Sequence, residues 1–196
     1  DAALSSYLRL LRAALSTKDV SAVRRLLDPA RVGARPRPRG TELGRVQRGL
    51  GPRDFLWAEL CAILRLGGTF EPGSGRGRFI APYVTGAWPT GLPMDTHVAV
   101  VRDGVPLVAR PGGRATAWLG HELVRLAGAH ELIPDGWTKV RTPGRTYGLV
   151  RSEDVRGPLD ASAVFEKRAG RWGLVAFGAG AGLAASRSKP GIGLHP

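Results

Sequence analysis

Short strand-like segments separated by tight turns fill residues 98–155, and they constrain the fold more than any other feature of the chain. In residues 137–142, Trp, Lys and Arg alternate with Thr, Val and Thr, so the two sets are expected on opposite faces of a strand. Residues 147–151 predict a return strand, and the dipeptide Asp103-Gly104 predicts a hairpin turn further upstream. Closely spaced strands of this kind predict a small β-barrel.

Three further segments refine this prediction. Pro106 has no backbone N–H, which predicts an edge position for the strand that contains it. Residues 152–155, Ser-Glu-Asp-Val, predict a single helical turn that closes the barrel. Upstream of the barrel, residues 79–84 are expected to be extended.

The second half of this stretch resembles the C-terminal half of a bacterial SH3 domain. The resemblance rests on Gly-Trp-x-x-Val at residues 136–140, Tyr-Gly-x-Val at residues 147–150, and the Ser-Glu-Asp-Val turn. It extends over residues 98–156, under a third of the chain. The family often shows Asn-Val-Arg-x-Gly-Pro near its first strand, where this chain has Leu-Val-Ala-Arg-Pro-Gly at residues 107–112.

This resemblance implies binding without catalysis. Exported relatives attach to cell-wall peptides or serve as the targeting domain beside a hydrolase. Aromatic grooves suit extended peptides, and cations suit carboxylates, which makes four residues the candidate ligand-binding set: Trp118, Trp137, Arg141 and Tyr147. Lys139 is expected beside them. A purely structural role stays open for Trp137, because the corresponding tryptophan of such barrels often covers the core.

The flanking regions are more faintly similar to NTF2-like or cystatin-like α+β proteins. Apolar residues at helical spacing predict helices in residues 1–28 and 52–66, and residues 163–177 predict a hairpin with a Gly-Arg-Trp turn. We therefore expect an α+β fold: N-terminal helices, an SH3-like barrel and a C-terminal hairpin that packs on the helices or on the barrel. The predicted divisions are a mainly helical region at 1–94, the barrel at 95–157, the hairpin at 158–178 and a flexible tail at 179–196.

The chain is strongly basic, with a formal net charge of +13. Lysine accounts for few of its 29 basic residues and arginine for the rest, an excess that coding bias alone could produce. The alternative is a polyanion or nucleic-acid contact through Arg35, Arg37 and Arg39 in the most basic stretch. No aromatic residue is interleaved there for base stacking.

The sequence offers little for catalysis or metal binding. The single cysteine, Cys61, falls inside a helical pattern, and His121-Glu122 lacks the second histidine of a zinc-protease motif. His97 lies near Asp95, but a metal site needs three or four convergent ligands. We therefore expect no enzyme activity, no cofactor and no bound metal.

Location and partners are inferred less directly. No run of about 18 apolar residues predicts a membrane span. A first residue of Asp1 fits removal of a signal peptide and equally fits a chain trimmed at its start. We expect an exported periplasmic or cell-envelope protein whose partner is a peptide, a cell-wall fragment or an envelope protein, with nucleic acid as the less favoured partner. The oligomeric state stays open.

Overall fold

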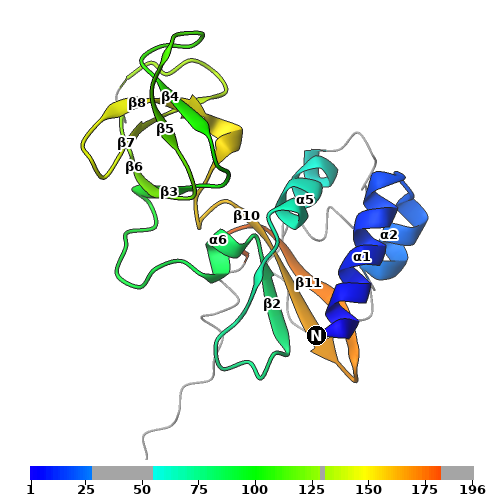
Figure 1. Cartoon of the computed structure of the whole chain (residues 1–196). Coiled ribbons are helices and arrows are strands. Elements are labelled where there is room, and N and C mark those ends of the chain that lie inside the picture. Colours follow the sequence, from blue (N-terminus) through cyan, green and yellow to red (C-terminus); the bar gives the residue numbers. More distant parts are fainter. Residues whose placement is uncertain (28–54, 129–130, 182–196) are drawn as a thin grey trace, which may run out of the picture. The chain divides into compact units, whose positions relative to one another are not determined.

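The chain folds into two compact units, each with its own sheet. A computed structural model describes residues 1–27, 55–128 and 131–181, which are coloured in Figure 1. Unit 1 comprises residues 1–87 together with 160–196, and unit 2 comprises residues 88–159. Helices combine with one four-stranded and one seven-stranded antiparallel sheet, so the predicted α+β class is confirmed.

Unit 1 packs helices against a four-stranded sheet. Its described residues form the helices α1 (Ala2–Ser16), α2 (Val20–Leu26), α5 (Phe55–Arg65) and the short α6 (Tyr83–Gly86). Its strands are β1 (Thr69–Phe70), β2 (Arg78–Ala81), β10 (Ala161–Arg168) and β11 (Arg171–Ala179). They lie in the order β1-β2-β10-β11, which follows the order of the chain.

Periodicity and capping explain the first helix. The Asp1 carboxylate accepts a hydrogen bond from the Leu4 amide at 3.0 Å, as an N-cap does. Four leucines at helical spacing then bury one stripe of α1: Leu4, Leu8, Leu11 and Leu15. The same Asp1 carboxylate pairs with the Lys167 ammonium at 2.9 Å, which fixes the start of α1 against the end of β10.

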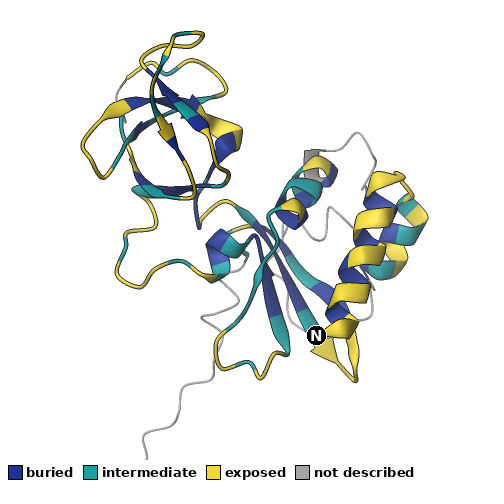
Figure 2. Ribbon diagram, in the orientation of Figure 1, coloured by how far each residue is buried: buried dark blue, intermediate teal, exposed yellow. Residues whose placement is uncertain are grey.

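The core of unit 1 lies between these helices and one face of the sheet, shown as buried in Figure 2. Phe165 in β10 is fully buried, and its ring meets Tyr7 edge-on at a centroid distance of 5.9 Å. The Tyr7 hydroxyl also donates to the Leu26 carbonyl and accepts from the Leu174 amide. One side chain thereby joins α1, α2 and β11 in a single core.

Unit 2 consists of a seven-stranded sheet. Its elements are β3 (His97–Val100), β4 (Val105–Val108), β5 (Ala115–Leu119), β6 (Leu123–Leu126), β7 (Trp137–Arg141), β8 (Tyr147–Arg151), the 3₁₀ turn η1 (Ser152–Asp154) and β9 (Val155–Arg156). The strand order is β5-β4-β8-β7-β6-β3-β9, so β5 and β9 are edge strands and the sheet stays open. Its core is built largely from inward-facing valines.

Three local predictions are wrong. Asp103-Gly104 does turn the chain, with Gly104 at φ +67°, but β3 pairs with β6 and β9 rather than with β4. The strand holding Pro106 is not an edge, because β4 lies between β5 and β8. Proline is tolerated there because the β4–β8 pairing is confined to Val108 and Leu149, away from Pro106. The segment 79–84 is extended only to Ala81, since residues 83–86 form α6.

The division of the chain differs in detail from the predicted one. Unit 2 spans 88–159, where the prediction placed 95–157. The C-terminal hairpin belongs to unit 1, because β10 pairs with β2 through four residue pairs beginning at Ala163 and Ala81. Ala179 still lies in β11, and residues 182–196 of the predicted tail lie outside the described residues.

A nearly buried carboxylate links the end of β3 to the turn that precedes β9 in unit 2. Asp154 in η1 has a side chain only 3% exposed, and it accepts a hydrogen bond from the Arg102 Nε–H, just after β3. This hydrogen bond, together with the charge of the carboxylate, raises the pKa of the Arg102 guanidinium. The pair therefore holds η1 against the end of β3.

Replacing Arg102 by methionine is expected to lower the melting temperature of unit 2, because it leaves the Asp154 carboxylate buried without a counter-ion. Adding Asp154→Asn to that variant should restore part of the loss, since no buried charge then remains. Thermal unfolding of the single and the double variant checks this, with the exposed Arg110→Met as the control. A double variant less stable than Arg102→Met would contradict the role of the carboxylate.

Candidate ligand-binding face

One side of the unit 2 sheet faces away from the valine core, and we call it the outer face. Val140 and Val150 are fully buried in the core. Because successive residues of a strand alternate in direction, Trp137, Lys139 and Arg141 of β7 lie on the outer face. The β7–β8 register places their direct partners beside them: Arg151, Leu149 and Tyr147.

Trp137 is a half-buried residue at the start of β7. The Arg151 guanidinium lies 4.3 Å from the centroid of its ring, within the range of a cation–π interaction. Trp137 therefore packs against an arginine on the outer face and lies outside the cluster of residues that forms the unit 2 core. The Trp137 ring therefore forms part of the outer face.

Arg141 and Tyr147 form a second cation–aromatic pair. They are direct partners in the β7–β8 register, and the Arg141 guanidinium lies 5.6 Å from the Tyr147 ring centroid. Tyr147 is 57% exposed. Lys139, between the two pairs, is already engaged, because its ammonium binds the Glu131 carboxylate. The predicted contribution of Lys139 to a ligand is therefore weakened, and Arg141 is the better-placed cation.

Trp118 lies on the edge strand β5 and is 69% exposed. It pairs with Pro106 of β4, while β4 joins β8 through Val108 and Leu149. In the strand order, β4 therefore lies between Trp118 on β5 and the residues of β8 and β7. The structure places all four sequence-predicted residues on the outer face, but only Trp137, Arg141 and Tyr147 lie on the neighbouring strands β7 and β8. Among the four, the contact is between Arg141 and Tyr147.

A hollow of about 340 Å³ opens beside Arg141 and contains residues that the sequence did not single out for binding. It is lined by Leu92, His97, Leu123, Arg125, Arg141, Thr142, Pro143 and Arg145. Alternation along β6 could have predicted that Arg125 lies on the outer face, because its neighbour Val124 faces the core. No local sequence signal could have brought β3, β6 and β7 together, because their pairings are long-range.

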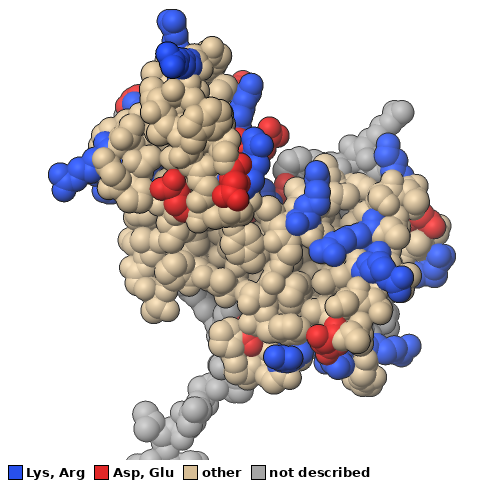
Figure 3. Space-filling model, in the orientation of Figure 1, with Lys and Arg blue, Asp and Glu red and all other residues tan. Residues whose placement is uncertain are grey.

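The predicted polyanion contact at Arg35, Arg37 and Arg39 lies outside the described residues. On the face drawn in Figure 3, lysine and arginine side chains project from both units instead of gathering into one patch. Dispersed cations of this kind give a weaker field than a single basic stripe would.

Two titratable side chains of unit 1, Cys61 and Tyr83, have a pKa shifted by burial. Burial raises the pKa of the Cys61 thiol, and the nearby charge of Arg65 offsets this only in part. A raised thiol pKa disfavours the thiolate, which is the nucleophilic form. Burial also raises the pKa of Tyr83. In residues 1–27, 55–128 and 131–181, no three His, Cys, Asp or Glu side chains converge as a metal site requires.

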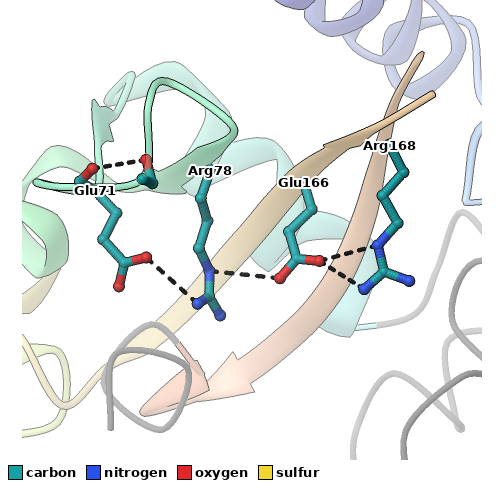
Figure 4. Close-up of polar contacts among 5 residues, drawn as sticks. Glu71, Arg78, Glu166 and Arg168 are labelled. Atoms are coloured by element: carbon teal, nitrogen blue, oxygen red, sulfur yellow. Dashed lines mark hydrogen bonds and ion pairs between the residues drawn. The ribbon is translucent and has the colours of Figure 1, made fainter. Parts of the chain in front are cut away.

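A second charged cluster lies on the sheet of unit 1, drawn in Figure 4. Glu71 pairs with Arg78 at 3.4 Å, Arg78 with Glu166 at 3.7 Å, and Glu166 with Arg168 at 2.7 Å. Acids and bases alternate along this chain, and Arg78 and Glu166 are direct partners between β2 and β10. Because each charge meets an opposite one, the cluster stabilises the sheet and leaves no excess charge for a ligand.

None of the helices in the described part of the chain has the length and apolar character needed to cross a bilayer. Comparisons with protein-family models, with curated proteins and with solved structures gave no match.

Proposed function

We propose that the protein is an exported, non-enzymatic binding protein whose unit 2 is an SH3-like barrel that holds a peptide or cell-wall peptide fragment. The observation that carries this proposal is the outer face. Large aromatic side chains are exposed there on β5 and β8, at Trp118 and Tyr147, and arginines lie against Trp137 and Tyr147. Exposed aromatic residues interleaved with arginine are typical of binding surfaces.

The path of the chain supports the barrel part of the proposal. A 3₁₀ turn, η1, follows β8 directly, where the sequence predicts the turn that ends the barrel. The next strand, β9, pairs with β3, so the last strand of the unit returns beside the first. Export belongs to the proposal because bacterial SH3 relatives that bind cell-wall peptides are exported.

Replacing Trp118 or Trp137 by alanine is expected to weaken retention on intact peptidoglycan by about tenfold or more, as truncation of an aromatic side chain at the centre of an interface does. The measurement is a pull-down of purified protein, with the bound fraction followed over protein concentration. Leu132→Ala is the matched control, because this fully exposed leucine lies in unit 2 outside the candidate set. Full retention by both tryptophan variants would contradict the site.

Salt separates this proposal from the polyanion alternative. Specific binding at the outer face should retain the protein on peptidoglycan at high salt, whereas binding by net charge falls steeply as salt rises. Double-stranded DNA serves as the second polymer in the same assay. Loss of binding to both polymers at high salt would contradict specific binding at the outer face. It would indicate that the net charge of +13 alone accounts for the retention.

A further inference from the structure

The hollow beside Arg141 is crossed by an unbroken row of paired residues on the outer face. His97 of β3 is the direct partner of Arg125 in β6, Arg125 is the partner of Arg141 in β7, and Arg141 is the partner of Tyr147 in β8. Direct partners in an antiparallel sheet have Cβ atoms about 4.5–5.5 Å apart and share a face. Four strands therefore bring an imidazole, two guanidinium groups and a phenol into one line.

The charges in this hollow are not compensated as they are in unit 1. Its lining contains three arginines and a histidine but no carboxylate. Among the described residues, no carboxylate forms an ion pair with Arg125, Arg141 or Arg145. Like charges directly opposite each other destabilise a sheet, as Arg125 and Arg141 do here. An anion placed between them would relieve this repulsion.

The remaining lining holds the cations in place and adds an apolar wall. The His97 Nδ1 and the Thr96 hydroxyl share a hydrogen bond at 3.0 Å, which orients the ring. Arg145 has a left-handed backbone, with φ +65°, and its amide donates to the Thr142 carbonyl at 2.9 Å. Leu92, Leu123 and Pro143 supply apolar surface beside the charges.

We infer that this hollow binds the free carboxylate of a short peptide with small apolar side chains, an inference that rests on the proposed peptide-binding function. The guanidinium groups of Arg125 and Arg141 donate N–H groups to the two carboxylate oxygens, and Arg145 adds a third cation. The apolar wall receives the neighbouring side chain. A volume of about 340 Å³ suits one or two amino-acid residues rather than a folded domain. The apolar wall also favours a carboxylate on an apolar stem over a free phosphate.

The test is a titration of the full chain with N-acetyl-alanyl-alanine and with the amide of the same dipeptide, followed by NMR. The two probes differ only in the terminal charge. We expect the acid to bind at least tenfold more tightly than the amide, with chemical shift changes centred on residues 97, 125 and 141. The variant Arg125→Gln/Arg141→Gln should lose this preference, whereas Arg110→Gln, an exposed arginine outside the hollow, should keep it.

The melting temperature distinguishes a binding role of Arg125 from a structural one, and competition by phosphate tests which anion is bound. Without ligand, Arg125→Gln should melt at the same temperature as the native chain or higher, because it removes a like-charge pair. A lower melting temperature would overturn the inference by showing that the arginine stabilises the fold. Inorganic phosphate is the competing anion, and binding of phosphate as tight as that of the dipeptide acid would overturn the carboxylate assignment.

The outcome also separates this inference from the proposed function. If the double arginine variant and the native chain are both retained on peptidoglycan and neither prefers the acid, the carboxylate site is wrong and the proposed binding at the outer face stands. If the native chain is not retained on peptidoglycan at all, the proposed function is wrong. An acid preference that depends on Arg125 and Arg141 would then still support the anion site.

Discussion

Replacing Phe165 by alanine should lower the free energy of unfolding of unit 1 by about 3–5 kcal/mol, the usual cost of removing a large aromatic side chain from a core. Phe165 is fully buried, and its ring packs against Tyr7 and, at a centroid distance of 6.2 Å, against Phe79. Truncation removes contacts to α1 and β2 at once. The measurement is urea unfolding combined with hydrogen exchange of peptides from β10 and β11.

Phe165→Leu is the control, because it retains most of the apolar volume and should cost only about 1–2 kcal/mol. Unit 2 has a separate core, so peptides from β7 and β8 should keep their protection from exchange in the alanine variant. Equal loss of protection in both units would show that their cores are not separate.

Replacing Gly148 by valine should destabilise unit 2 by about 3 kcal/mol through overpacking. A Cβ atom at Gly148 would lie 2.6 Å from Leu107 Cγ, 2.7 Å from Leu107 Cδ1 and 3.0 Å from the Val108 carbonyl oxygen. Leu107 is fully buried, so it cannot move aside without disturbing its neighbours. Hydrogen exchange of β4, β7 and β8 peptides measures the effect.

Gly144→Ala is the matched control in the turn between the same two strands. Its Cβ would meet only the Thr142 hydroxyl, at 3.8 Å, so stability should change by less than about 0.5 kcal/mol. If Gly148→Val were as stable as Gly144→Ala, β4 would not lie against β8 as the structure has it.

Local patterns predicted the elements of this fold better than their pairing. Strict alternation marked β7 and β8, and their register places the residues on the expected faces. The C-terminal hairpin was predicted from its turn, although β10 and β11 run further than expected. The partners of β3 could not be predicted, because β6 and β9 are distant in sequence and the Asp103-Gly104 turn favours a neighbour that β3 does not have.

The candidate site shows the same division. Trp118, Trp137 and Tyr147 were accessible to sequence reasoning because aromatic residues in alternating strands are few and conspicuous. Arg125 was one arginine among many, and its significance comes from lying opposite Arg141. The two arginines become neighbours only when β6 pairs with β7. Composition and periodicity therefore could not predict that they lie opposite each other.

The place of unit 2 in the chain has a consequence for folding order. The sheet of unit 1 would be a simple meander, except that unit 2 interrupts the connection between β2 and β10. Closing a disordered connection of about 70 residues costs about 2 kcal/mol more in loop entropy than closing a short turn. Once unit 2 is folded, its strands β3 and β9 lie side by side and much of that entropy is already lost. Unit 1 should therefore assemble faster after unit 2 has folded. This effect needs no contact between the units, because it comes only from the shorter effective connection between β2 and β10.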